Sequence, residues 1–255
     1  MKIVLLGAGN VATHIGIALK ETNAQLLQVY SRSFESAKTL GEKLAVDYCC
    51  NVDELNKTAD VYLYAVKDDA LSELIKQTKI LNGVHVHTAG SVKMDVFNGY
   101  VKNYGVLYPL QTFSKDKSVR FSEVPLFIES NNSFANEMIV RVAHMLSALV
   151  YENIDSEKRK ILHLSAVFAC NFTNYMYVVA DELLQTIKLD YNVLLPLIKE
   201  TTNKLNYLSP REAQTGPAAR KDEKTIKKHI EWLQNNHDAK NMYELISKNI
   251  ERNIN

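Results

Sequence analysis

The stretch Gly7-Ala8-Gly9-Asn10-Val11-Ala12 has the residue types that hold a dinucleotide pyrophosphate. Gly7 permits a tight turn, Gly9 lets the backbone approach the phosphates, and Ala12 allows the helix to pack closely on the strand. Residues 3–6 are apolar and precede the turn, and helical spacing follows it. We therefore expect a strand, a glycine turn and a helix whose free amides bind the pyrophosphate. An ordinary strand-to-helix turn is the alternative.

The end of the second expected strand indicates which dinucleotide binds. Ser31, Arg32 and Ser33 stand about twenty residues past the glycines, where an NAD site places Asp or Glu on the ribose. A guanidinium between two hydroxyls suits the 2′-phosphate instead, because arginine binds phosphate bidentately. We therefore expect NADP as the cofactor. The alternative is that Arg32 is a solvated turn residue.

Two later strands, expected at 59–66 and 84–87, end in small and polar residues. Parallel strands of one sheet end over the same crevice, so small side chains there leave room for ribose and nicotinamide. His85 and His87 share a strand face, but a third ligand at suitable spacing is absent, so no metal site is expected. The further cofactor-binding candidates are Ala65, Val66, Lys67, Thr88, Ala89 and Gly90, with Ser91 on the substrate side.

Three polar residues are candidates for the reaction itself. His87 and His163 are possible proton donors, because the unperturbed pKa of histidine lies near neutrality. Asn171 would orient a carbonyl or imine. It lies eight residues after His163 in an apolar helical stretch, where polar groups are either satisfied core residues or the lining of a site. The two interpretations are equally supported.

Further polar and aromatic residues are candidates for binding the substrate. Arg220 follows a rigid Gly-Pro turn, where it would bind a carboxylate or, equally, pair with a surface acid. The candidate set comprises Ser91, Tyr108, Pro109, Gln111, Asn174, Thr215, Gly216 and Arg220.

The elements that must position these residues alternate between strand and helix as far as residue 108. This alternation predicts a Rossmann-like, doubly wound parallel sheet, an α/β fold, over residues 1–153, followed by an all-α domain over residues 154–255. Expected strands lie at 25–30, 45–48, 59–66, 84–87, 105–108, 125–129 and 150–152, and expected helices at 34–44, 51–58, 70–80, 93–97 and 134–149.

A long helix is expected to open the second domain. Asp155 can cap it, and residues 162–180 are apolar or small on nearly every face. Such a helix should be buried on all sides, so we expect it to be shared with a second subunit in a homodimer. Further helices are expected at 191–208, 222–234, where Asp222 is the cap, and 238–254.

The composition narrows the function classes. The chain has 255 residues and a net charge of +1, from 30 basic and 29 acidic side chains, which argues against nucleic-acid or membrane-surface partners. Cys49, Cys50 and Cys170 are too few for a disulfide framework, so a reducing compartment, the cytoplasm, is expected. No run approaches about 18 apolar residues, so no membrane span is expected. A small-molecule substrate fits this composition.

Together these motifs resemble a bacterial family of Rossmann-like proteins, described as NADP oxidoreductases, with a helical C-terminal domain of unknown function. The motifs that carry the resemblance are the glycine turn, Ala65-Val66-Lys67-Asp68-Asp69, His87-Thr88-Ala89-Gly90-Ser91, Tyr108-Pro109-Leu110-Gln111-Thr112-Phe113 and Thr215-Gly216-Pro217-Ala218-Ala219-Arg220. The family is similar to pyrroline-carboxylate reductase, ketopantoate reductase and deazaflavin-dependent NADP oxidoreductases. The resemblance implies hydride transfer between NADP(H) and a small carboxylate-bearing keto, hydroxy or imino compound.

Two departures leave the reaction open. Ketopantoate reductase and related hydroxyacid dehydrogenases carry a lysine one helical turn before a catalytic asparagine, and here Val167 stands before Asn171. Relatives of the prephenate dehydrogenase type place a catalytic histidine where this chain has Tyr108. A non-catalytic NADP-binding redox sensor or partner-binding dimer is therefore the alternative function, and a deazaflavin is an alternative hydride partner.

Overall fold

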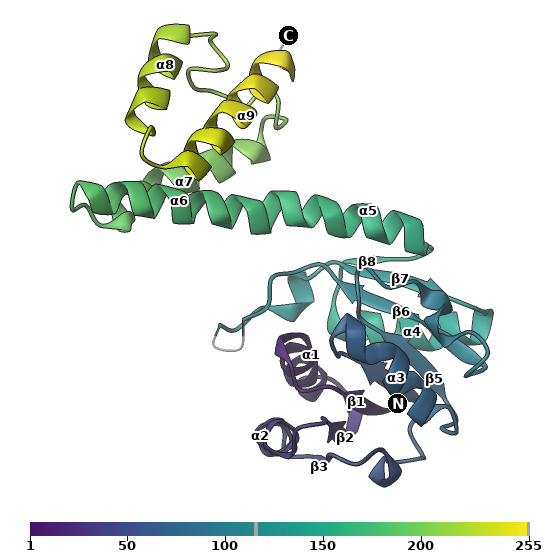
Figure 1. Cartoon of the computed structure of the whole chain (residues 1–255). Helices are drawn as coiled ribbons and strands as arrows, with labels where there is room; N and C mark the ends of the chain where they lie inside the picture. The colour runs from purple at the N-terminus through teal and green to yellow at the C-terminus, as the bar shows by residue number, and fades with distance from the viewer. Residues whose placement is uncertain (115–116, 254–255) are drawn as a thin grey trace. The chain divides into compact units, whose positions relative to one another are not determined.

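A computed structural model describes residues 1–114 and 117–253 of the chain (Figure 1). The chain divides into two compact units, Met1–Asn171 and Phe172–Asn255, which are described separately below. The expected domain boundary after residue 153 stays a prediction. Within the described ranges, no helix has the length and apolar content needed to cross a bilayer.

The first unit contains an eight-stranded sheet in the order β3-β2-β1-β4-β5-β6-β7-β8. All neighbouring strands are parallel except β6 and β7, which are antiparallel. The strands are β1 Lys2–Leu6, β2 Gln25–Tyr30, β3 Asp47–Cys49, β4 Val61–Tyr64, β5 Val84–His87, β6 Asn103–Pro109, β7 Leu126–Ser130 and β8 Val150–Tyr151. The predicted Rossmann-like α/β fold is confirmed.

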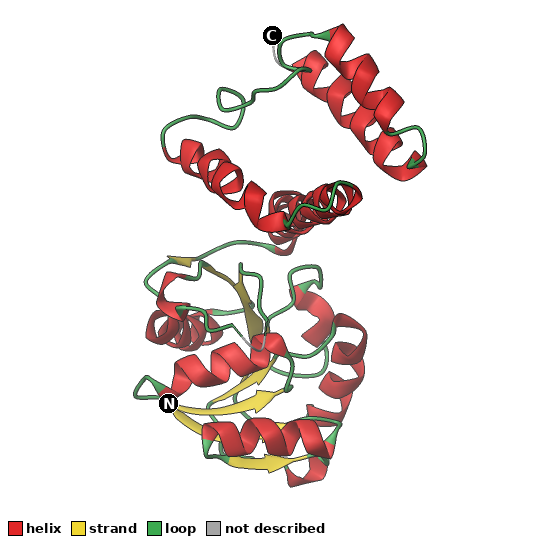
Figure 2. Cartoon of the chain, turned by 90° about the vertical axis from the view of Figure 1, so that its left-hand side faces the viewer, coloured by secondary structure: helices red, strands yellow, loops and turns green. Residues whose placement is uncertain are grey.

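Helices cover both faces of this sheet (Figure 2). Helices α1 (Asn10–Lys20), α2 (Phe34–Leu44) and α4 (Ser133–Leu146) pack on one face, where Ile3 and Leu5 of β1 are fully buried. Helix α3 (Asp68–Thr78) and a short 3-10 helix, Met94–Phe97, pack on the other face. Buried apolar side chains on both faces of β1 explain why its sequence is a continuous apolar run.

The prediction of a helix over residues 51–58 is wrong, because only a single 3-10 turn, Val52–Glu54, forms there. The amide side chain of Gln28 accepts a hydrogen bond from the backbone of Asn56 at 2.8 Å and donates to the carbonyl of Glu54 at 3.1 Å. These tertiary contacts use backbone groups that a helix would bond internally. The expected helix over 93–97 is likewise a 3-10 turn.

Helix α5 (Ser156–Ala166) is the last α-helix of the first unit. It begins at the predicted cap, since the Asp155 side chain accepts a hydrogen bond from the Lys158 amide. A π-helical segment, Val167–Phe172, connects it to α6 (Thr173–Thr186). The expected burial on all sides is not met within one chain, because apolar side chains there are exposed, Leu164 by 51% and Tyr175 by 51%.

The second unit is all-helical, as predicted. The helix expected over residues 191–208 is three shorter pieces, and Asp222 is the cap of α8 as expected. Besides α6, the unit contains the 3-10 helices Tyr191–Leu194 and Lys204–Asn206 and the α-helices α7 (Leu195–Asn203), α8 (Glu223–Trp232) and α9 (His237–Asn253).

Candidate functional site

The glycine turn has the geometry that its sequence predicts. Gly7 has a φ of +130°, and its amide donates to the carbonyl of Tyr30 at 2.7 Å. A Cβ atom at Gly7 would lie 2.2 Å from the carbonyl oxygen of Ala65. Only glycine fits this position, because both the backbone conformation and the close approach of β4 exclude a side chain.

The N-terminus of α1 is open for an anion. Gly9 is its N-cap, and within residues 1–114 and 117–253 no side chain caps the helix and a Cβ at Gly9 would meet nothing within 4 Å. Uncapped amides with free space in front of them suit a phosphate, which the helix dipole also favours. Ala12 is fully buried against the sheet, and the Asn10 side chain donates to the carbonyl of Phe113 at 2.8 Å. Val11 lies beside them on α1.

A cavity of about 510 Å³ lies beside this turn and brings nine of the expected cofactor residues together. Its remaining wall comes from Tyr30 at the end of β2, from the first turn of α2 and from α3. The nine residues are Gly7, Ala8, Gly9, Ser31, Arg32, Ser33, Ala65, Val66 and Lys67.

Three residues after β2 form a polar corner of this cavity. The Ser31 hydroxyl oxygen accepts from the Ser33 amide at 3.4 Å, and that of Ser33 caps α2 by accepting from the Ser36 amide at 3.3 Å. Both hydroxyl protons stay available to an anion, since in these contacts each hydroxyl only accepts. The Arg32 side chain is exposed beside them. This corner can therefore offer a guanidinium and two hydroxyl donors to one phosphate.

The loop after β5 holds the other expected cofactor residues, Thr88, Ala89 and Gly90. The Thr88 amide donates to the carbonyl of Tyr64 at 3.1 Å, which extends the pairing of β5 with β4. The Ala89 amide donates to Nδ1 of His87 at 3.2 Å. These bonds fix the loop at the carboxyl end of the sheet, where Rossmann-like folds bind their ligands.

A histidine and a tyrosine meet over Gly90. Nδ1 of His163, from α5, lies 3.0 Å from the hydroxyl oxygen of Tyr108, from the end of β6. A Cβ at Gly90 would lie 2.8 Å from the same nitrogen and 3.0 Å from the tyrosine ring. Burial raises the pKa of Tyr108 to about 12, against a smaller opposing effect of Arg159. Tyr108 is therefore a neutral phenol at physiological pH, and its hydroxyl can donate a hydrogen bond to His163.

His87, the other histidine expected to donate protons, lies inside the sheet layer. Its side chain is fully buried and stacks on Phe97, with ring centroids 5.8 Å apart. Burial, and secondly the charge of Arg159, lower its pKa to about 3. His87 is consequently neutral at physiological pH, and its Nε2 atom has no hydrogen-bond partner among the residues that the structure describes.

His85 is part of a buried polar cluster. Its Nδ1 lies 2.7 Å from the Tyr64 hydroxyl, which lies 2.6 Å from the Thr78 hydroxyl, and its Nε2 lies 3.1 Å from the carbonyl of Leu81. Both ring nitrogens are thus engaged. Among residues 1–114 and 117–253, no group of three potential metal ligands lies together.

The remaining expected substrate residues of the first unit are dispersed around the loop ends. The Ser91 hydroxyl donates to the carboxylate of Asp68. Pro109 is buried at the end of β6, and the exposed Gln111 bonds the backbone of its neighbour, Thr112. Asn171, the third residue predicted to take part in the reaction itself, is exposed in the π-helical segment.

Four expected substrate residues belong to the second unit. Thr215 and Gly216 line an apolar cavity of about 260 Å³ whose other walls come mainly from α6 and α9. Arg220 and Asn174 are exposed. The first unit thus brings together the cofactor residues and the Tyr108–His163 pair, but not Asn174, Thr215, Gly216 or Arg220.

Sequence reasoning missed Arg159, a buried cation next to this pair. Its side chain is 1% exposed, forms an ion pair with Glu129, and stands one helical turn before His163. The spacing of four residues, which places both on one face of α5, was the available signal.

Two family descriptions together match most of the chain. Residues 2–86 match "NADP oxidoreductase coenzyme F420-dependent", and residues 124–250 match a domain of unknown function, DUF2520. The whole chain is similar to the "putative NADP oxidoreductase BF3122" of Bacteroides fragilis, with 44% identity, 98% of each chain covered and a TM-score of 0.93.

More distant matches have the same fold or share only a segment. Pyrroline carboxylate reductase of Plasmodium falciparum, solved with NADP bound, is 13% identical with a TM-score of 0.64, over 100% of this chain and 98% of that one. L-aspartate dehydrogenase of Methanocaldococcus jannaschii is 30% identical over 86 residues, 32% of each chain. The chain thus spans about a third of the length of this curated relative. Given the B. fragilis match and its own domain order, the chain belongs to the NADP-dependent oxidoreductase family in which the F420-dependent type of NADP oxidoreductase domain precedes DUF2520.

Proposed function

We propose that this protein is an NADP-dependent oxidoreductase that transfers a hydride between NADP(H) and a small carboxylate-bearing keto, hydroxy or imino compound. The observation that carries the proposal is the cavity beside the glycine turn, where nine expected cofactor residues meet. The loop after β5 leads from the sheet to the Tyr108–His163 pair, so groups suited to a nucleotide and to proton transfer share the carboxyl edge of the sheet.

NADP fits the residues of this cavity. The uncapped start of α1 would hold the pyrophosphate, and Ser31, Arg32 and Ser33 would hold the 2′-phosphate. Thr88, Ala89 and Gly90 would face the nicotinamide half. When bound, NADPH supplies the hydride, and the protein supplies orientation and the proton.

His163 is the proton donor in this proposal. In the resting state of this proposal the Tyr108 hydroxyl donates to Nδ1, so that the ring proton is on Nε2, the atom that would face the substrate. Uptake of a solvent proton at Nδ1 would give the imidazolium, which would transfer the Nε2 proton to the substrate while Nδ1–H donates to the Tyr108 oxygen. His87 is the weaker of the two candidates, because a fully buried neutral imidazole is out of reach of a substrate.

Substrate binding and assembly extend the proposal. Ser91, Gln111 and Asn171 would contact the substrate from the first unit. Arg220, Thr215 and Asn174 of the second unit stay predicted substrate residues, with a carboxylate as the group that Arg220 would bind. A second copy of the chain would cover the exposed apolar side chains of α5 and α6, including Leu164 and Tyr175. The homodimer would work in the cytoplasm, in keeping with three cysteines that are all unpaired.

Calorimetric titration with NADPH and NADH, on the native protein and on Arg32→Ala, tests the cofactor. We expect NADPH to bind at least about tenfold tighter than NADH, because charged hydrogen bonds to phosphate contribute roughly 1.5–3 kcal/mol, and the gap to close in the variant. If neither nucleotide binds, the proposal fails.

A panel of keto acids and cyclic imines tests the reaction, with the oxidation of NADPH measured by its absorbance. Turnover that is lost in His163→Gln while NADPH still binds supports the proposal. NADPH binding without oxidation of NADPH by any panel member favours the non-catalytic redox sensor instead.

A further inference from the structure

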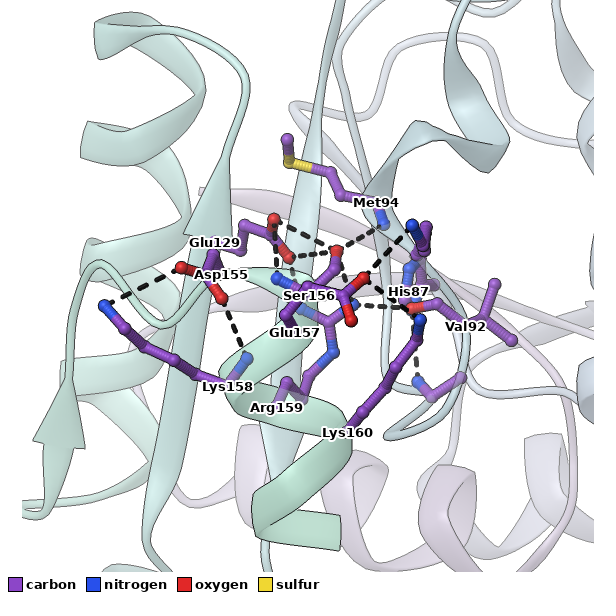
Figure 3. A network of polar contacts seen from close by, with 12 residues as sticks. His87, Val92, Met94, Glu129, Asp155, Ser156, Glu157, Lys158, Arg159 and Lys160 are labelled. Carbon is purple, nitrogen blue, oxygen red and sulfur yellow. Dashed lines mark hydrogen bonds and ion pairs between the residues drawn. The ribbon is translucent and has the colours of Figure 1, made fainter.

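Arg159 joins three segments of the first unit that are distant in sequence (Figure 3). Its Nη1 atom pairs with the carboxylate of Glu129 on β7. Its Nη2 atom donates to the carbonyl of Val92 at 2.5 Å and to the hydroxyl of Ser156 at 3.2 Å. Val92 follows the loop that contains Gly90, so one guanidinium holds that loop, the sheet and the start of α5 together.

Glu129 completes the attachment of α5. Its carboxylate accepts from the Ser156 amide at 3.0 Å and from the Ser156 hydroxyl at 2.9 Å. The Ser156 hydroxyl oxygen also accepts from the Met94 amide at 3.1 Å. The first turn of α5 is therefore fixed to β7 and to the segment after the Gly90 loop, by groups that are partly buried.

We propose that Arg159 is a positioning residue, which holds His163 against Gly90 and the Tyr108 hydroxyl by tying α5 to the loop after β5. His163 is four residues, one helical turn, beyond Arg159, so a shift of the first turn of α5 moves the imidazole directly. The inference rests on the proposed function for the reaction that the pair serves.

The charge of Arg159 also acts on the groups around it. Burial raises the pKa of Tyr108 to about 12, and Arg159 opposes that rise. For His87, burial and Arg159 act in the same direction and lower its pKa to about 3. Arg159 thus favours a neutral His87 in the sheet layer and limits the rise of the Tyr108 pKa.

A purely structural ion pair is the competing explanation. Apolar residues in place of a buried ion pair often leave a protein folded, whereas removal of one partner leaves a costly lone charge. The double variant Arg159→Met/Glu129→Leu therefore removes the guanidinium without stranding a carboxylate. Lys158→Met is the matched control, since Lys158 is the exposed neighbour on α5 and pairs with Asp155 at 3.7 Å.

The test is the state of the His163 ring by ¹⁵N NMR on histidine-labelled full-length protein, with His163→Gln used to assign its signals. We expect one tautomer, protonated on Nε2, in the native protein and in Lys158→Met. In the folded double variant we expect averaged nitrogen shifts, because the imidazole leaves the Tyr108 hydroxyl. An unchanged single tautomer in that variant overturns the proposal.

Arg159→Lys provides the second arm if the double variant does not fold. Lysine keeps the charge beside Glu129 but cannot reach Val92 and Ser156 with a planar fork. Movement of the His163 shifts toward averaging supports the positioning role, and native shifts overturn it. NADPH titration of the native protein separates the two proposals, because absence of binding defeats the oxidoreductase function while the ring signals still report on Arg159.

Discussion

The Nδ1 atom of His163 lies 3.0 Å from the hydroxyl oxygen of Tyr108, although 55 residues separate the two in the chain. The contact is possible because Gly90 has no side chain, since a Cβ there would lie within 3.0 Å of both rings. The glycine of one loop thus sets the distance between a helix and a strand end. Three separate elements must keep their positions for one hydrogen bond to exist.

Tyr108→Phe should separate hydrogen bonding from packing. The ring contact with Phe127, at 6.4 Å between centroids, stays, while the bond to His163 is lost. We expect the free energy of unfolding to fall by about 0.5–1.5 kcal/mol and turnover by about tenfold. Urea unfolding and steady-state kinetics measure the two effects. Native turnover in this variant would mean that the tyrosine does not orient the histidine.

Gly90→Ala should displace His163 without removing it. The new Cβ would approach Nδ1 to 2.8 Å, so the imidazole must move away from the Tyr108 hydroxyl. We expect a folded protein with turnover reduced about 10²-fold, as for loss of a general acid. The control is Gly90→Ala combined with His163→Gln, where no further loss of turnover at saturating NADPH is expected beyond the single His163→Gln variant. A large additional loss would mean that the methyl group acts mainly on the nicotinamide half proposed to lie beside Gly90, and not through His163.

Two glycines of the same turn should respond differently to alanine. Gly7→Ala introduces a side chain at a φ of +130° and 2.2 Å from the Ala65 carbonyl, so we expect a loss of more than about 2 kcal/mol in stability. The new Cβ of Gly9→Ala meets no atom of the described residues within 4 Å, so the protein should fold normally. Its methyl group would occupy the space proposed for the pyrophosphate. Thermal unfolding and NADPH calorimetry on both variants check this, and equal NADPH affinity for native protein and Gly9→Ala would contradict it.

Local sequence signals predicted much of the first unit. Strand β2, helix α2 and strand β5 have the predicted bounds, because β-branched and apolar residues within β2 and β5, and the capping Ser33 directly before α2, are local signals. The helix expected at 51–58 failed where Gln28, more than twenty residues away, binds its backbone. The pattern of residues 51–58 cannot show that the distant Gln28 side chain competes for the backbone groups of this segment.

The sequence predicted which residues belong to the candidate site better than it predicted their contacts with one another. The glycine turn and Arg32 come from a spacing that one segment contains, and they line one cavity. Arg159 was not expected, because its partners Glu129 and Val92 lie 30 and 67 residues away and the topology alone brings them together. The burial of His87 was not predictable either. Its place in the strand predicts which face of the sheet its side chain lies on, but not the full burial that lowers its pKa.

Acid should destabilise the protein through two buried histidines. Burial lowers the pKa of His85 to about 4 and that of His87 to about 3, whereas both have pKa values near 6.5 when unfolded. Their contribution is present above pH 6.5 and is lost as the pH falls, because only the unfolded chain binds the two protons. Near pH 5 the two together lower the free energy of unfolding by up to about 2.7 kcal/mol per pH unit.

His87→Leu removes one of these protons and should flatten the slope by about 1.4 kcal/mol per pH unit. Urea unfolding at pH 7, 6 and 5 measures both slopes, with the exposed His237→Leu as control. A variant slope equal to the native one would show that His87 is already protonated in the folded protein.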